Sequence, residues 1–281
     1  MDFGRGPLSQ PLLVEAFDDE FVPLLVFNNK EGRDAELLAR FREPSWNNPV
    51  MRFLAADGSD VLARRDGIWS TPAVAARLVE ALAAAKRPVP AWLTGVAQEL
   101  GARRATALFT LYCYWEGEAL LGGMEGVLAT TAVDLPAAAT GSGKAEEALQ
   151  IEYDAAQVTH AQLAAAWKTL RCADRDLSGD AKALAAAVPA KPSDRKHALR
   201  ATPWWRLPMT PRQQCRANSA AAAGKDPLAE LTPRQQRLAR RLADASDHAR
   251  AALEQLEPAE TLDALPAYDA AVTALFTQTG G

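Results

Sequence analysis

The sequence is poor in cysteine and has no long apolar run, and these absences exclude several classes of protein. Its three cysteines, Cys113, Cys172 and Cys215, are scattered and odd in number, which argues against a disulfide framework and favours a reducing cytoplasm. There is no CxxC pair or Cys/His cluster, so we expect no metal and no cofactor. The apolar segments are too short for a bilayer-spanning helix and the first residues do not resemble a signal peptide, so we expect no membrane association.

An excess of positive charge is also missing. The 281 residues include 31 Lys and Arg against 35 Asp and Glu, a net charge of -4. Proteins that bind nucleic acid through its phosphates are more often basic, so no nucleic-acid partner is expected. With 48% hydrophobic and 23% charged residues, the composition is that of a globular protein with one large domain or two ordinary ones.

The N-terminal part has the order strand, helix, strand, hairpin, helix. The apolar run Leu24–Phe27 predicts a buried strand, and Asp34–Phe41 has the periodicity of an amphipathic helix. Val50–Leu54 predicts a strand with a hairpin partner at Asp60–Ala63, and a helix follows from Thr71.

This order, with Asn48-Pro49 opening a strand, resembles the thioredoxin family, whose proline at this place is cis and faces the active site. No cysteine precedes Cys113, so this part cannot perform dithiol exchange, and a structural or docking module is favoured. Two prolines in Lys86–Pro90 end the helix and suggest a domain boundary.

The middle of the chain predicts three strands, at Thr106–Tyr112, Val127–Val133 and Glu147–Tyr153. Cys113 comes directly after the first strand, where a short helix begins. Backbone N–H groups and the dipole at a helix start favour a thiolate, the nucleophilic form of cysteine. The Gly-Ser-Gly-Lys loop at residues 141–144 lacks the remaining residues of a phosphate-binding loop, so we interpret it as a flexible loop.

Several motifs in one order resemble the A-type peptide methionine sulfoxide reductase family over residues of about 103–222. The matching segments are Cys113-Tyr114-Trp115 with Glu118, Gly126-Val127, Glu147 before a strand ending in Tyr153-Asp154, a helix with Trp167, and Leu207–Gln213.

The resemblance implies a peptide-methionine (S)-S-oxide reductase-like oxidoreductase. Cys113 would attack the sulfoxide sulfur as a thiolate and become a sulfenic acid, while Glu147 would protonate the leaving oxygen. Tyr114 and Trp115 would form the apolar wall that receives the substrate methyl group, and Asp194 matches a binding residue of the family. Ala132-Val133-Asp134-Leu135 replaces a Gly-Tyr pair of the family, so a related oxidised sulfur substrate stays an option.

The resolving thiol would be Cys215 or Cys172, or an external thiol. The implied partners are an oxidised sulfur substrate, such as methionine sulfoxide in proteins, and thioredoxin or another thiol reductant.

The predicted fold class is α+β with two domains. Residues 1–88 would form a thioredoxin-like domain without CxxC, residues 89–222 a ferredoxin-like α/β sandwich of the methionine sulfoxide reductase A type, and residues 223–281 a helical C-terminal extension. Two alternatives to the reductase stay open. One is a non-catalytic binding or redox-sensing protein that kept the fold, and the other is a thiol peroxidase that uses the same cysteine.

Overall fold

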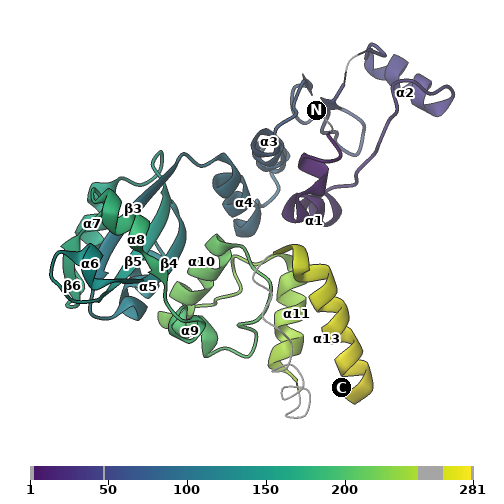
Figure 1. Ribbon diagram of the computed structural model, residues 1–281. Coiled ribbons are helices and arrows are strands. Elements are labelled where there is room, and N and C mark those ends of the chain that lie inside the picture. The colour runs from purple at the N-terminus through teal and green to yellow at the C-terminus, as the bar shows by residue number, and fades with distance from the viewer. Residues whose placement is uncertain (1–2, 47, 246–261, 280–281) are drawn as a thin grey trace. The chain divides into compact units, whose positions relative to one another are not determined.

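The computed structural model describes residues 3–46, 48–245 and 262–279 of the chain (Figure 1). They divide into two compact units, Met1–Gly101 and Ala102–Gly281. Helices and antiparallel sheets together give an α+β protein, as the sequence predicted. The boundary lies after Gly101 rather than after residue 88, because helix α4 packs against α3 of the first unit.

The first unit has a small helical core and a short two-stranded sheet. The helix predicted from Thr71 is confirmed as α3, and Val74, Leu78 and Leu82 on one of its faces are all buried. Strands β1 and β2 pair antiparallel, and an isolated bridge joins Leu54 to Asp60, so the predicted hairpin is present in shortened form. The elements of this unit are η1 (Pro7–Ser9), α1 (Pro11–Glu20), α2 (Arg33–Phe41), β1 (Val50–Met51), β2 (Arg65–Asp66), α3 (Thr71–Ala84) and α4 (Ala91–Gly101).

The predicted buried strand at Leu24–Phe27 is wrong. This segment has no regular secondary structure, and Leu25 is 71% exposed. An apolar run becomes a strand only when another strand pairs with it, and the described sheet of this unit consists of β1 and β2 alone. The Asn48–Pro49 peptide bond directly before β1 is cis, as the resemblance to thioredoxins implied.

The second unit is built on a five-stranded antiparallel sheet with the strand order β6-β3-β5-β4-β7. From β3 to β6, apart from the four-residue helix α6, the elements follow the order strand, helix, strand, strand, helix, strand. The predicted strands at Thr106–Tyr112, Val127–Val133 and Glu147–Tyr153 are confirmed as β3, β4 and β5. The elements of the sheet and its helices are β3 (Arg104–Leu111), α5 (Tyr114–Leu121), β4 (Val127–Leu135), α6 (Ala137–Thr140), β5 (Glu146–Asp154), α7 (His160–Trp167), β6 (Ala173–Asp176), α8 (Ala181–Ala186) and β7 (Val188–Pro189).

Both faces of this sheet are covered, and neighbouring residues of β3 show the alternation that a strand requires. Phe109 faces a core built with α5 and α7, where its ring stacks on Trp167 with centroids 4.8 Å apart. Leu108 faces the opposite core, which includes Val133 of β4 and Ala183 of α8. The sheet therefore holds its strand ends rigidly, including the end of β3 from which α5 begins.

The C-terminal helices belong to this unit, and two of them begin with the same sequence, Thr-Pro-Arg-Gln-Gln, at residues 210–214 and 232–236. In both α10 and α11 this repeated sequence forms a capping box, at Thr210 and Thr232. The buried amides of Gln213 and Gln235 bond each other, at 2.8 and 3.0 Å. The remaining elements are η2 (Pro192–Asp194), α9 (His197–Arg200), α10 (Pro211–Ala222), α11 (Pro233–Ala243), η3 (Leu262–Ala264) and α13 (Leu265–Thr279).

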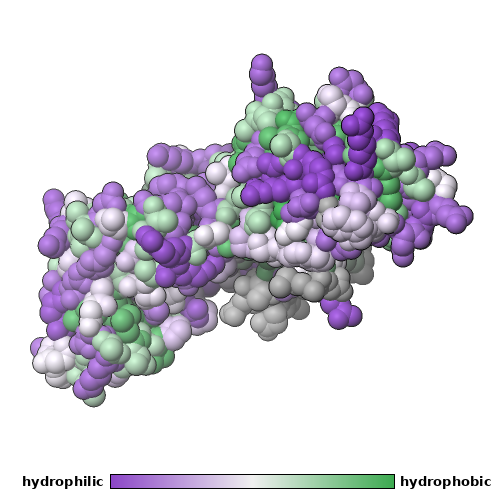
Figure 2. All heavy atoms as spheres, turned by 90° about the horizontal axis from the view of Figure 1, so that it is seen from above, coloured by the Kyte–Doolittle hydropathy of each residue, from purple (hydrophilic) through white to green (hydrophobic). Residues whose placement is uncertain are grey.

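Hydrophilic side chains cover most of the face shown in Figure 2, with smaller apolar patches between them. Within the three described ranges, none of the helices combines the length and the apolar character that crossing a bilayer demands.

Candidate functional site

Cys113 lies at the junction that the sequence predicted, between the end of β3 and the start of α5. It is the N-cap residue of α5, in extended conformation with φ -153° and ψ 95°, and its side chain makes no capping hydrogen bond. The residue is partly exposed, and its thiol is free. The cysteine thus lies at the N-terminal end of a helix.

The carboxyl group of Glu147 reaches the same helix start. It accepts a hydrogen bond from the backbone N–H of Tyr114, the residue that follows Cys113. Burial raises the pKa of Glu147, and the hydrogen bond from Tyr114 offsets only part of that rise. The negative charges of Asp134, its cross-strand neighbour, and Asp194 raise the pKa further. A carboxyl group in this environment holds its proton to a higher pH than usual.

Tyr114 and Trp115 directly follow the cysteine, on the first turn of α5. Burial, followed by the negative charges of Glu147 and Asp194, raises the pKa of Tyr114 to about 12. The Trp115 indole N–H donates to the backbone carbonyl of Asp194 at 2.9 Å, and the indole remains 40% exposed. Both predicted aromatic residues and the predicted aspartate therefore gather at the same helix end as Glu147.

A buried ion pair fixes the segment that carries Asp194. Glu118, on α5 and fully buried, accepts hydrogen bonds from both the backbone N–H and the ammonium group of Lys196, each at 2.6 Å. Lys196 has a positive φ of 51° and also donates to the hydroxyl of Thr130 at 3.0 Å. The next residue, His197, stacks its ring on Trp115 with centroids 4.1 Å apart. These contacts hold the segment that carries Asp194 against α5.

The two other cysteines have different surroundings. The Cys172 thiol donates to the backbone carbonyl of Cys113 at 3.7 Å and to a carboxylate oxygen of Glu116 at 3.5 Å. Cys215, on α10, accepts from the backbone N–H of Thr130 at 3.0 Å. It packs beside Gly122, at the far end of α5 from Cys113. The structure therefore brings Cys172 to Cys113, and it places Cys215 about 12 Å further along the helix axis.

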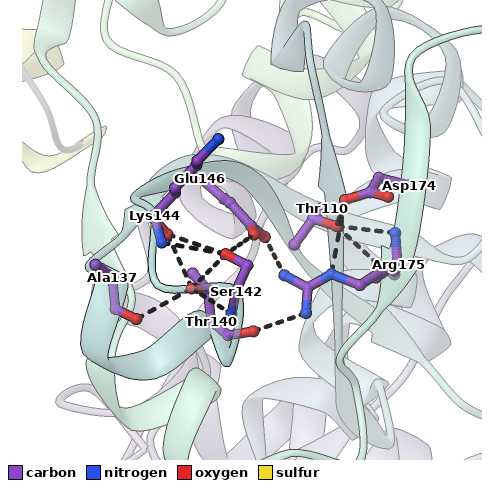
Figure 3. A network of polar contacts seen from close by, with 8 residues as sticks. All are labelled: Thr110, Ala137, Thr140, Ser142, Lys144, Glu146, Asp174 and Arg175. Atoms are coloured by element: carbon purple, nitrogen blue, oxygen red, sulfur yellow. Dashed lines mark hydrogen bonds and ion pairs between the residues drawn. The ribbon is translucent and has the colours of Figure 1, made fainter.

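The Gly-Ser-Gly-Lys loop at residues 141–144 makes several hydrogen bonds of its own (Figure 3). The Thr140 hydroxyl donates to the Lys144 carbonyl at 2.8 Å, and the Ser142 hydroxyl donates to Glu146 at 2.5 Å. Arg175 pairs with Glu146 and donates to the Thr140 carbonyl at 2.7 Å. The loop leads into strand β5 and not into a helix, and its contacts fix the strand end that carries Glu147.

No protein-family model matches the sequence, and no curated protein matches it either. In the part of the chain that the structure describes, no three His, Cys, Asp or Glu side chains are grouped to hold a metal ion. A thiol at a helix start, near a partly buried carboxyl group whose pKa is raised, can attack an electrophilic atom while the carboxyl group protonates the group that leaves.

Glu116 and Lys196 were not singled out from the sequence, and Glu118 and His197 were not assigned to the site. Glu118 belongs to the motif around Cys113, and its place one helical turn after Tyr114 could have indicated that it faces the same core. Glu116 lies on the first turn of α5, and its side chain is exposed. Lys196 and His197 follow Asp194 directly, but their contacts with α5 join positions that are far apart in the sequence and that no local pattern predicts.

Proposed function

We propose that the second unit is a thiol-dependent reductase of methionine sulfoxide or a related oxidised sulfur substrate, with Cys113 as nucleophile and Glu147 as proton donor. One observation carries the proposal. The Glu147 carboxyl group is hydrogen-bonded to the backbone N–H of Tyr114, immediately beside the cysteine, and its pKa is raised by burial. A nucleophile and an acid thus share one helix end.

The proposed reaction balances in atoms and electrons. The Cys113 thiolate attacks the sulfoxide sulfur, and Glu147 gives its proton to the sulfoxide oxygen. The oxygen passes to the cysteine sulfur as a hydroxyl group, which yields the sulfide and a sulfenic acid on Cys113. The substrate sulfur is reduced by two electrons, and the cysteine sulfur is oxidised by two.

The aromatic surroundings support a substrate that carries an apolar group next to its oxidised sulfur. Trp115 is 40% exposed and Tyr112 is 77% exposed, so aromatic surface is open to solvent on both sides of Cys113. Such surface can accept a side chain presented by another protein. The Trp115 ring is fixed by its hydrogen bond to the Asp194 carbonyl and by stacking on His197.

The fold of the second unit supports a finer domain assignment, which we also propose. The antiparallel order β6-β3-β5-β4, with helices after the first and third of these strands in sequence, is the ferredoxin-like arrangement. For the first unit, the described two-stranded sheet of β1 and β2 does not support the thioredoxin-like expectation, and we propose a structural or docking module there. Thioredoxin or another thiol would be the reductant, and the three free thiols fit a cytoplasmic location.

Steady-state reduction of methionine sulfoxide with a dithiol reductant tests this proposal. Glu147→Gln is expected to lower kcat/KM by about 10²–10⁴-fold, the usual loss on removing a general acid, and Cys113→Ser is expected to abolish turnover. Glu152→Gln is the matched control, because Glu152 lies on the same strand and pairs with Arg104 away from the site. Equal rates for the wild type and Glu147→Gln would remove Glu147 from the mechanism.

The same preparations distinguish the alternatives. Turnover of hydroperoxides but not of sulfoxides would identify a thiol peroxidase. If the folded wild type turns over neither substrate, the remaining alternative is a non-catalytic binding or redox-sensing protein.

A further inference from the structure

A groove between helices α11 and α13 shares no residue with the thiol site. The two helices lie side by side in the second unit (Figure 1), where an ion pair and a hydrogen bond join them. The groove has a volume of about 360 Å³, which lies at the small end of the range for small-molecule sites. Arginines dominate its lining, which consists of Arg234, Arg237, Leu238, Arg241, Asp269 and Thr273.

The three arginines of the groove lie on one face of α11. Arg234, Arg237 and Arg241 are three and four positions apart, which is the spacing of neighbours on a helix surface. From the first to the last they cover about 10 Å along the helix axis. Helix α11 contains no acidic residue, although acidic residues outnumber basic ones 35 to 31 in the chain. Asp269 is the only acidic residue of the lining, so the groove carries an excess of positive charge.

Two of the guanidinium groups are held in place by α13. The Nε and Nη2 atoms of Arg234 each lie 3.0 Å from the same carboxylate oxygen of Asp269. Arg241 donates to the Thr273 hydroxyl at 3.0 Å, and its guanidinium lies over the Phe276 ring, 5.1 Å from the centroid. A guanidinium group has five N–H donors, so both arginines keep donors for a ligand. Because the two groups are already positioned, a ligand does not have to order them.

The third arginine, Arg237, is exposed and lies between the other two along the helix. Its side chain has no hydrogen-bond or ion-pair partner in the described ranges of the chain. Like charges three and four positions apart repel each other and destabilise a helix. Arg234 also lies in the first turn, where the helix dipole disfavours a positive charge. The arrangement is therefore unfavourable for the helix alone, and a bound anion would relieve the repulsion.

We propose that this groove binds phosphate groups linked in a row, as in a diphosphate or a triphosphate. The planar fork of a guanidinium group matches the oxygens of a phosphate, and two N–H groups can donate to it at once. A line of three guanidinium groups over about 10 Å offers donors to several linked phosphates, whereas a single anion would contact only part of it. An inorganic phosphate chain and the phosphates of a nucleotide share this chemistry.

Isothermal titration calorimetry of the full chain with tripolyphosphate tests the proposal. We expect one ligand per chain and an affinity that falls as sodium chloride is added, because salt screens the attraction. Arg237→Gln and Arg241→Gln should each lower the affinity at least about 10-fold, since each removes hydrogen bonds to a charged group. The matched control is Arg240→Gln, which removes the same charge from the same helix. Arg240 bonds Gln236 and does not line the groove, so this variant should bind like the wild type.

Thermal unfolding gives a second readout that does not depend on the heat of binding. A ligand that binds only the folded chain raises its melting temperature. Tripolyphosphate should therefore raise the melting temperature of the wild type and of Arg240→Gln, and it should have a smaller effect on Arg237→Gln. Circular dichroism without ligand checks that Arg237→Gln is folded, as we expect for an exposed side chain without partners.

Two further ligands define the chemistry of the groove. ATP that binds at least about 10-fold more tightly than tripolyphosphate would identify a nucleotide as the ligand, and ATP that binds no more tightly would identify the phosphate chain alone. Citrate is the control polyanion without phosphate.

Three results would overturn the proposal. They are no binding of tripolyphosphate to the folded wild type, equal affinities for citrate and tripolyphosphate, and equal losses of affinity in Arg240→Gln and Arg237→Gln. None of these measurements involves the reduction of a sulfoxide, so the groove and the proposed function are tested separately.

Discussion

Replacing Glu118 by Gln should destabilise the second unit strongly, because it leaves a buried ammonium group without its counter-ion. The Glu118 side chain is fully buried and that of Lys196 is 12% exposed. Burial alone would lower the pKa of Lys196, but attraction to Cys215 and Glu118 outweighs it and raises the pKa. Removing one partner of such a pair typically costs about 3–5 kcal/mol.

At about 2–4 °C for each kcal/mol in a domain of this size, the melting temperature should fall by about 6–20 °C. Urea unfolding followed by circular dichroism would give the free energy of unfolding. Lys196→Met in the Glu118→Gln background should restore part of the loss, since the uncompensated charge is then gone. A loss in the free energy of unfolding below about 1 kcal/mol, which is typical of exposed ion pairs, would refute the conclusion that this ion pair is buried and holds the segment that carries Asp194 against α5.

Three further outcomes follow from the contacts described. Because the folded state raises the pKa of Glu147, the free energy of unfolding should fall as the pH rises above 4.5 and through the folded pKa; Glu147→Gln should remove that fall when melting temperature is measured against pH. Tyr114 should ionise only near pH 12 against an ordinary value of 10.0, so Tyr114→Phe should delete a step near pH 12 from a spectroscopic tyrosine titration, and an unchanged titration would contradict its burial. Gln235→Ala removes the hydrogen bonds to Gln213 and to the Pro208 carbonyl, so it should lower the free energy of unfolding in urea by about 1–3 kcal/mol. A loss below about 0.5 kcal/mol, the usual effect of substituting an exposed residue, would contradict the contact between the two helix starts.

Local patterns in the sequence predicted those elements whose stability is local or strongly periodic. β5 alternates buried and half-buried residues, and the capping boxes at Thr210 and Thr232 mark their helix starts. The strand predicted at Leu24–Phe27 failed because a strand depends on a partner that its own residues do not specify.

The candidate site could be predicted only as far as its motif extends. Glu147 reaches the residue after Cys113 because β3 and β5 pair in register, and that pairing could be expected once both strands were assigned. That Cys172 rather than Cys215 lies near Cys113 depends on which strand lies on the other side of β3. The order of the strands depends on contacts between segments that are far apart in the sequence, so no local segment of the sequence specifies it.

Single turnover without any reductant tests the central claim most directly. The full chain is mixed with an excess of methionine sulfoxide, and methionine is counted per protein molecule by chromatography. The account predicts one equivalent of methionine from the wild type, with oxidation confined to Cys113 and its disulfide partner, and none from Cys113→Ser. Methionine formation that is the same in Cys113→Ser, or absent from the folded wild type, would contradict it.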